Sequence, residues 1–191
     1  MTSVLVPLAD GVEEMEAVIL IDVLRRAGWN VVAAGLDDGP ITASRRVRLL
    51  ADQPWSAVNP LDFDVLAIPG GAGGVARLSI DGRVLAATRE FARAGKWIAA
   101  VCAGPLVLQA AGLLAGRRVT CSPAVAEKLT ATPRLPERVV VDGKLVTSQG
   151  PGTSFEFALA LVKLIEGPEK AAAVAAGMVV PDDLLAALRG G

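Results

Sequence analysis

Short apolar runs alternate along this chain with segments in which apolar residues recur every three or four positions. The runs suit strands buried on both faces of a sheet, and they are Ser3–Leu8, Asn30–Leu36, Asp64–Ile68 and Trp97–Val101. The periodic segments and their end signals predict helices over Glu13–Ala27, Asp81–Ala94, a segment directly after Cys102, Thr153–Ile165 and a segment beginning at Pro168. Strands that alternate with helices indicate an α/β protein with a mostly parallel sheet covered on both faces.

The remaining segments predict local structure. Val139–Thr147 is expected to be an antiparallel hairpin, because its central Asp-Gly pair suits a two-residue turn. Thr153 and Glu156 have the spacing of a capping box at a helix start. Ile41–Leu50 is expected to be an irregular or hairpin segment. Arg117–Cys121 is expected to be a strand and Ala124–Leu129 a short helix.

The length of 191 residues suits one domain, which we expect over residues 1–180. Residues 181–191 form a tail whose pattern is typical of a short amphipathic helix on the surface. Composition agrees with a compact fold, since 52% of the residues are hydrophobic and 20% are charged.

Charge and cysteine content narrow the possible partners and the compartment. Nineteen basic and twenty acidic residues give a formal net charge of −1, and no long basic run indicates a nucleic-acid or anionic membrane partner. Two cysteines are too few for a disulfide scaffold, and the N-terminal segment turns acidic too early for a signal peptide. We therefore expect a cytoplasmic protein.

One apolar span, Trp97–Gly116, has about the length of a membrane helix. Gly104, Pro105 and Gly112 interrupt it. The span divides more naturally into a strand and a following helix than it forms one continuous membrane helix.

Two candidate chemical positions fall where predicted strands end. Cys102 would lie at a helix N-terminus, where free N–H groups and the helix dipole would lower the pKa of its thiol. Gly70 and Gly71 follow another strand and could point backbone N–H groups at an oxyanion. Cys102 is equally well explained as a small core residue, and Cys121 is better explained by packing.

The chain contains no histidine, so it cannot build a Cys-His or Ser-His relay within one subunit or a histidine zinc site. A carboxyl group would have to assist Cys102. Glu16 follows Glu13 by three residues among apolar neighbours, so it could face inward with a raised pKa and move protons. An ordinary solvated acidic helix start explains the same glutamates and is favoured by the residues alone.

Six segments together resemble the ThiJ/PfpI superfamily, in the branch of the Parkinson-disease-associated protein deglycase. They are LADGVEEMEAV, DVLRRAGWNVV, ASRRVRLLAD, DVLAIPGGAGG, AAVCAGP and LVTSQGPGTSFEFAL. The resemblance extends from Ser3 to about Gly177. It implies a flavodoxin-like three-layer sandwich and a homodimer.

The resemblance also implies roles for individual residues. Cys102 would be the nucleophilic and oxidisable cysteine, and Glu16 the acid hydrogen-bonded to its sulfur. Backbone donors of oxyanion type would come from Gly70, Gly71 and Ala103.

Three further positions follow from the resemblance. Arg45 and Arg26 would lie beside the pocket and the dimer interface, and Ser122 stands where many members of the branch place a histidine. A histidine is also missing directly after the cysteine, where this chain has Ala103, which argues against a peptidase.

The resemblance implies an enzyme that converts reactive dicarbonyls, such as glyoxal or methylglyoxal, or removes their adducts from proteins or nucleotides. No cofactor or metal would be needed. A redox sensor or holding chaperone, in which Cys102 is oxidised to a sulfinate, is the alternative. A binding subunit with a vestigial pocket is a third possibility.

Overall fold

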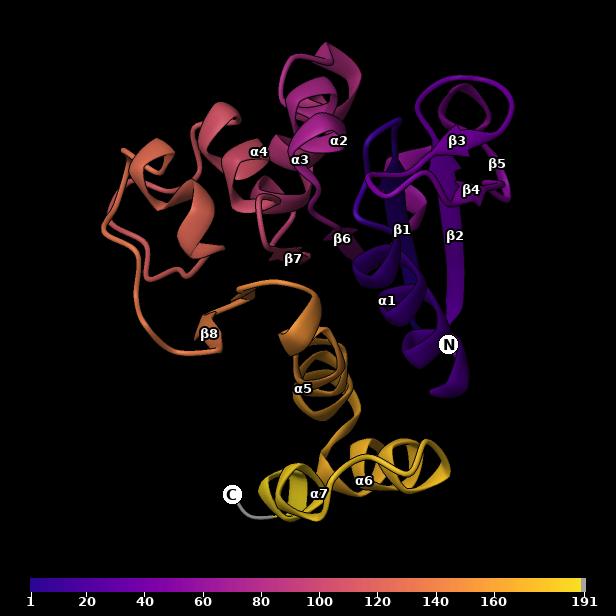
Figure 1. Cartoon of the computed structure of the whole chain (residues 1–191), viewed down its shortest axis with the longest axis vertical. Helices are drawn as coiled ribbons and strands as arrows, with labels where there is room; N and C mark the ends of the chain where they lie inside the picture. The colour runs from indigo at the N-terminus through magenta and orange to yellow at the C-terminus, as the bar shows by residue number, and fades with distance from the viewer. Residues whose placement is uncertain (190–191) are drawn as a thin grey trace.

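A computed structural model describes residues 1–189 of the chain, in which helices surround a central sheet (Figure 1). The strands are β1 Ser3–Leu8, β2 Asn30–Gly35, β3 Ile41–Thr42, β4 Arg48–Leu49, β5 Gln53–Pro54, β6 Val65–Ile68, β7 Trp97–Val101, β8 Val139–Asp142 and β9 Leu145–Ser148. The α-helices are α1 Glu14–Arg26, α2 Ala72–Leu78, α3 Gly82–Arg93, α4 Pro105–Ala110, α5 Ser154–Glu166, α6 Pro168–Gly177 and α7 Asp182–Arg189. Short 3₁₀ helices are η1 Trp55–Ala57, η2 Pro60–Asp62, η3 Pro123–Lys128 and η4 Pro151–Thr153.

The main sheet has seven strands in the order β5-β2-β1-β6-β7-β9-β8. Every neighbouring pair is parallel except β8 and β9, which form the predicted antiparallel hairpin. The hairpin is part of the sheet, because β9 pairs in parallel with β7. The second predicted hairpin, β3 with β4, is a separate two-stranded sheet.

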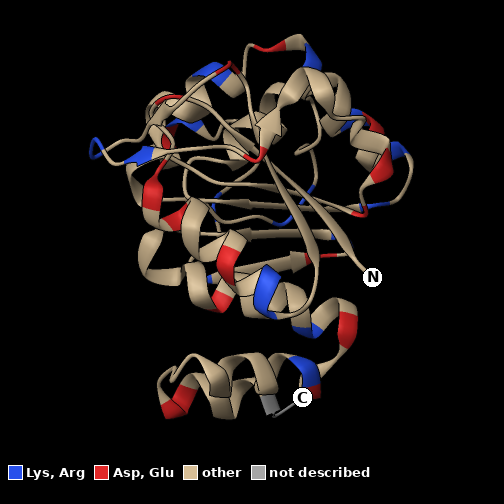
Figure 2. Cartoon of the chain, turned by 90° about the vertical axis from the view of Figure 1, so that its right-hand side faces the viewer, with Lys and Arg blue, Asp and Glu red and all other residues tan. Residues whose placement is uncertain are grey.

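The sheet is buried on both faces. Along β1, Val4 and Val6 pack in one core with α1 and α5, while Leu5 packs in a second core with α3 and α4. The α6 and α7 helices lie beyond α5, away from the sheet (Figures 1 and 2). Acidic and basic residues are interspersed on the side of the molecule shown in Figure 2. These layers confirm the predicted mostly parallel α/β fold.

Two local predictions were wrong. Arg117–Cys121 is not a strand, since its one bridge joins Val119 to Arg134, and the N–H of Thr120 donates to the side-chain oxygen of Thr147. No capping box forms at the start of α5.

The α5 helix starts as predicted but is held differently. The hydroxyl of Thr153 bonds to Ser148 and to the loop backbone at Gly150, while Glu156 pairs with Arg138. Thr153 and Glu156 therefore connect the start of α5 to the end of β9 and to the start of the neighbouring strand β8. The spacing of these residues in the sequence could not indicate such contacts.

The apolar span from Trp97 divides into β7 and α4. Within the described residues, no helix combines the length and apolar character required to cross a membrane. The short helix α2 was not predicted.

The expected tail helix is α7, and the last two residues of the predicted tail, 190–191, lie outside the described residues. Its Leu188 is buried, and Leu184 and Leu185 pack against the same core as α5 and α6. The apolar face of this helix is therefore covered by the domain.

Candidate active site around Cys102

The candidate site forms where three neighbouring strands end. β1, β6 and β7 are adjacent and parallel, so their carboxyl ends meet at one edge of the sheet. The helix after β1 carries Glu16, the turn after β6 carries Gly70 and Gly71, and Cys102 directly follows β7.

The backbone at Cys102 has a conformation that residues other than glycine rarely adopt. Its φ is 61°, in the left-handed region, which is strained for a residue with a Cβ. Two hydrogen bonds hold it there. The N–H of Cys102 donates to the carbonyl of Ser148 at 3.0 Å, and its carbonyl accepts from the N–H of Ser122 at 2.9 Å. The segments around Ser148 and Ser122 therefore hold the backbone of Cys102 and, with it, the position of the sulfur.

The sulfur of Cys102 is half-buried and lies among three polar groups. The backbone N–H groups of Gly71 and Ala103 donate to it, and its third partner is the carboxyl group of Glu16. Sulfur therefore sits in a cradle of two fixed donors and one titratable group.

Glu16 is completely buried, with 0% of its surface exposed. Its Oε2 accepts a hydrogen bond from the N–H of Gly70 at 2.7 Å. Its Oε1 is buried without a well-formed hydrogen bond, and Cys102 is the second polar group that interacts with this carboxyl. Of the neighbouring glutamates, Glu13 caps α1, whereas Glu14 is buried and accepts hydrogen bonds from the Ser44 hydroxyl and the Arg45 N–H. A solvated acidic helix start therefore does not describe Glu14 either.

Burial controls the titration of both groups. It raises the pKa of Glu16 from 4.5 to about 7, although the hydrogen bonds from Cys102 and Gly70 oppose the rise. It also raises the pKa of the Cys102 thiol to about 12, and the charge and hydrogen bond of Glu16 add to this effect. The expectation that a helix N-terminus would lower the thiol pKa was therefore wrong. α4 is a single short helix that starts only at Pro105, and desolvation outweighs its contribution.

The two groups form a coupled pair that shares protons. Two of the three influences that raise the Cys102 pKa require Glu16 to be ionised. When Glu16 holds its proton, this repulsion is absent, whereas desolvation, the largest cause, still raises the pKa of the thiol, and the Gly71 and Ala103 donors oppose it only in part. Protonation of Glu16 is thus the condition under which the thiolate is least disfavoured.

Glycine is required twice in the turn after β6, for different reasons. A Cβ at Gly70 would lie 2.5 Å from Oε2 of Glu16 and 2.6 Å from Cβ of Cys102. Gly71 has a φ of 89°, and a Cβ there would overlap the carbonyl oxygen of Gly11. The N–H of Gly70 is occupied by Glu16, so the prediction that it serves as a free oxyanion donor is corrected.

The structure brings Ser122 next to Cys102 through the backbone, while its hydroxyl accepts from the N–H of Ala124 and caps η3. Arg45 lies on the β3–β4 loop, near the start of α1. Arg26 does not lie beside the site. It pairs with Asp22 on the surface of α1, ten residues beyond Glu16 or about 15 Å along the helix.

Sequence reasoning missed Ser148, which holds the backbone of Cys102. Its contribution to Cys102 is a backbone carbonyl, which any residue would supply. No side-chain signal could therefore have identified it.

Within residues 1–189, no group of three or more histidine, cysteine, aspartate or glutamate side chains is placed to bind a metal.

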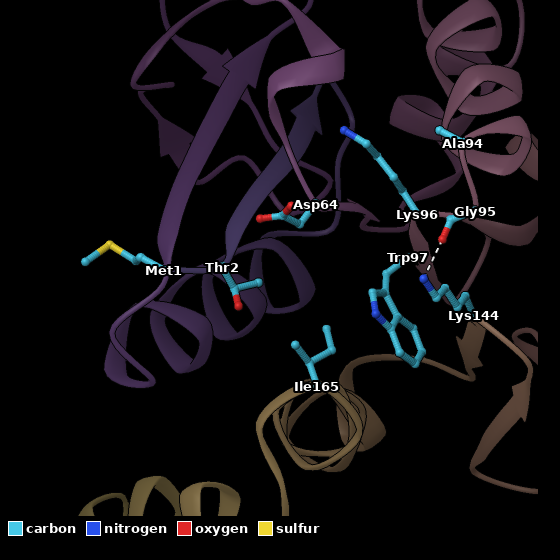
Figure 3. Close-up of a pocket in the computed structure, with 9 residues that line it drawn as sticks. All are labelled: Met1, Thr2, Asp64, Ala94, Gly95, Lys96, Trp97, Lys144 and Ile165. Carbon is cyan, nitrogen blue, oxygen red and sulfur yellow. Dashed lines mark hydrogen bonds between the residues drawn. The ribbon is translucent and has the colours of Figure 1, made fainter.

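A cavity of about 600 Å³ lies at the opposite edge of the sheet, where strands β1, β6, β7 and β9 begin (Figure 3). Its two lysines are committed to backbone carbonyls. Lys96 donates to Phe63 at 2.7 Å and Lys144 donates to Gly95 at 2.6 Å. The cavity contains no nucleophile of the kind found at Cys102.

The chain matches the model of the DJ-1/PfpI family over residues 2–164. Protein DJ-1 homolog B of Arabidopsis thaliana is 45% identical over 87% of this chain, which spans only 39% of that relative's length. The glutathione-independent glyoxalase DJR-1.2 of Caenorhabditis elegans is 39% identical, over 87% of this chain and 89% of the relative.

Two solved structures show the same architecture. Drosophila melanogaster DJ-1beta has a TM-score of 0.90 and 41% identity, with 94% of this chain and 98% of that one covered. The oxidized DJ-1 of Toxoplasma gondii has a TM-score of 0.89 and 41% identity, with the same coverage.

Burial of Glu16 makes the stability of the fold depend on pH. Its pKa of about 7 in the folded chain exceeds the ordinary value of 4.5, so the folded state binds more protons between these values. The contribution of Glu16 to the free energy of unfolding is therefore greatest below pH 4.5 and declines as the pH rises through 7. The decline is about 3 kcal/mol, at about 1.4 kcal/mol per pKa unit.

We expect Glu16→Gln to lose most of this decline when urea unfolding is measured at pH 4 and pH 8. Glu137 is exposed, so Glu137→Gln is a matched control that should behave like the wild type. Equal declines in the wild type and Glu16→Gln would contradict the assignment.

Proposed function

The chain belongs to the DJ-1/PfpI family, and from this premise we propose that it is a cofactor-independent enzyme acting on reactive dicarbonyls or their adducts. The observation that carries the proposal is the completely buried Glu16 carboxyl, which has a pKa of about 7 and interacts with Cys102. A carboxyl that titrates near neutral pH can both give and take a proton under working conditions. The glyoxalase named among the relatives supports the same reaction class.

The reaction begins when the Cys102 thiolate attacks the aldehyde carbon of a 2-oxoaldehyde. A C–S bond forms, the carbonyl electron pair moves to oxygen, and that oxygen takes the proton from Glu16, giving a hemithioacetal. Glu16 is then a carboxylate beside the former aldehyde carbon. It is positioned to act next as the base.

Glu16 then carries the hydrogen of this carbon, as a proton, to the adjacent carbon. The hydroxyl proton of the first carbon passes to the oxygen of the second, so the hemithioacetal becomes the thioester of a 2-hydroxy acid without net oxidation or reduction. Water cleaves the C–S bond, the acid leaves, and the remaining proton returns to Glu16. The sum is one dicarbonyl and one water converted to one hydroxy acid, such as methylglyoxal to lactate.

The backbone donors serve two stages of this sequence. The N–H groups of Gly71 and Ala103 first stabilise the thiolate. Once the C–S bond has formed, sulfur no longer carries the charge, and the same fixed dipoles face the oxygen on which charge develops. Because they belong to the backbone and are already oriented, they need no rearrangement during the reaction.

Adducts of dicarbonyls on proteins or nucleotides are included in the proposed substrate class, since the same carbonyl chemistry reverses their formation. Both cysteines are free, and the proposed nucleophile requires a free thiol. A reducing compartment such as the cytoplasm suits this requirement.

We expect Cys102→Ser to abolish lactate formation from methylglyoxal, because a serine hydroxyl ionises far less readily than a thiol in the same surroundings and is a much weaker nucleophile. The measurement is a coupled lactate assay on purified protein. Cys121→Ala is the matched control and should retain most of the rate, since Cys121 is fully buried and its thiol bonds to the carbonyl of Ser122, not to the groups around the Cys102 sulfur. Full activity of Cys102→Ser would show that the nucleophile is wrongly assigned.

A redox-sensing role is a second candidate, favoured by the same cradle. Two N–H donors and a carboxyl hydrogen would also bind the oxygens of a cysteine sulfinate. One similar solved structure is described as oxidized.

Treatment with dilute hydrogen peroxide should add two oxygen atoms to Cys102, with two peroxide molecules reduced to water. Intact mass and peptide mapping measure the uptake, with Cys102→Ala as the control that should gain none. Selective uptake together with no dicarbonyl turnover would favour sensing over catalysis, whereas indiscriminate oxidation of both cysteines would count against sensing.

We further propose that the chain forms a homodimer through the outer face of α1 and the adjoining β3–β4 segment. Four large apolar side chains are exposed there, namely Met15, Val18, Val47 and Leu50. Val18 and Leu50 line one surface groove, so these two elements form a continuous apolar surface. Covering such a surface stabilises an assembly.

Sedimentation should therefore give twice the chain mass of 19.6 kDa for the wild type and 19.6 kDa for Val18→Asp. Ile80→Asp is the matched control, because Ile80 is also a large apolar residue and is even more exposed, but lies after α2. A wild-type monomer, or a dimer unaffected by Val18→Asp, would refute this interface.

A further inference from the structure

A cavity of about 300 Å³ lies between α2, α4 and η3, on the side of the sheet away from α1. The α2 helix presents one stripe to it, from Ala72 through Ala76 to Ser79. Leu106 of α4 and Lys128 of η3 line the other walls. We call this cavity the three-helix groove.

The three-helix groove lies next to the Cys102 cradle, and Cys102 itself does not line it. Ala103 lines the groove and also donates its N–H to the sulfur. Ala72 lines it and directly follows Gly71, which supplies the second N–H donor. The third wall, η3, is capped by Ser122, whose N–H donates to the carbonyl of Cys102. One end of the groove is therefore within a residue of both donors to the sulfur.

The character of the groove changes with distance from the sulfur. Its near part is lined by alanines and by the side chains of Val75 and Leu106. Ser79 lies seven residues beyond Ala72 along α2, which corresponds to about 10 Å. The near part therefore offers apolar contact over a length of several carbon atoms.

Polar groups lie at the far end. The hydroxyl oxygen of Ser79 is buried without a hydrogen-bond partner. Lys128 is exposed, and no carboxylate of the described residues pairs with it. Gln109 is not available to a ligand, because its amide bonds to the backbone of Lys128, Thr130 and Ala131. A hydroxyl and an ammonium together suit a carboxylate.

We propose that the three-helix groove is the subsite for the substituent of the substrate, and that it selects 2-oxoaldehydes whose hydrocarbon chain ends in a carboxylate. The proposal rests on the function proposed above, since it places the reacting aldehyde at Cys102. The hydrocarbon chain of the substrate occupies the apolar part of the groove, and its terminal carboxylate contacts Lys128 and Ser79.

The test compares how fast Cys102 is alkylated by three iodoacetamides, followed by intact mass. The probes are iodoacetamide, N-hexyl iodoacetamide and 6-(iodoacetamido)hexanoate, the last two differing only in a terminal methyl or carboxylate. In each case sulfur forms a bond to carbon, iodide leaves, and the thiol proton passes to solvent. This readout needs no dicarbonyl turnover.

In the wild type, 6-(iodoacetamido)hexanoate should react faster than both other probes. Ala76→Phe fills the groove and should lower the rate of both long probes relative to iodoacetamide by about tenfold. Arg77→Phe is the matched control, since Arg77 is an exposed neighbour on α2 that does not line the groove.

Lys128→Gln should lower the preference for the carboxylate probe over the hexyl probe by about threefold, as expected for an exposed ion pair, and Lys128→Arg should restore it. The proposal would be overturned if Ala76→Phe left the rates of the long probes relative to iodoacetamide unchanged and Lys128→Gln left the preference for the carboxylate probe over the hexyl probe unchanged. Failure of any probe to label Cys102 would also overturn it, because the groove must lead to a reachable sulfur.

Turnover of methylglyoxal, 2-oxoheptanal and 6,7-dioxoheptanoate by the same variants separates this proposal from the proposed function. Responsive labelling ratios without turnover of any aldehyde would reject the enzyme and keep the groove. Turnover of all three at rates indifferent to Ala76→Phe would keep the enzyme and reject the groove.

Discussion

The site depends on one proton shared between two acids, the buried carboxyl of Glu16 and the half-buried thiol of Cys102. Both groups are partly or wholly desolvated, so ionising both at once would place two neighbouring negative charges where water screens them poorly. One proton therefore stays with the pair, and hydrogen bonds decide which atom keeps it. Donors to the sulfur from Gly71 and Ala103 favour the thiolate, while the donor from Gly70 to the carboxyl favours the opposite distribution. This balance makes a proton available near neutral pH in a protein that has no histidine.

The fold maintains the pair at a cost in backbone strain. Cys102 occupies a left-handed conformation, and the turn after β6 needs two glycines to pass beside it. The strain is sustained because β7 is paired on both sides and its following residues are bonded to Ser148 and Ser122. Nucleophilic attack and oxidation to a sulfinate would both use this fixed cradle, because each places negatively charged atoms in front of the same donors.

The helices that follow these strands extend the site outward. α2 and α4 each begin within a few residues of a donor to the sulfur, so the surface between them leads away from the reacting atoms. Helix α1 has a double role, since its inner face buries Glu16 and its outer face exposes Met15 and Val18. Association through that outer face would restrain the helix that positions the acid.

The sequence by itself determined the layered α/β fold, because apolar runs, helical periodicity and end signals are local properties that the tertiary structure did not override. It also located Cys102 and Gly71 at strand ends. It could not decide that Glu16 and Glu14 are both buried, nor that desolvation would raise the thiol pKa, because both depend on which segments pack over α1 and β7. The backbone contacts of Ser148, the loss of Gly70 as a free donor and the distance of Arg26 from the site were likewise decided only in three dimensions. Each of these three features arises from packing between segments that are distant in the sequence, and local sequence patterns carry no information about such packing.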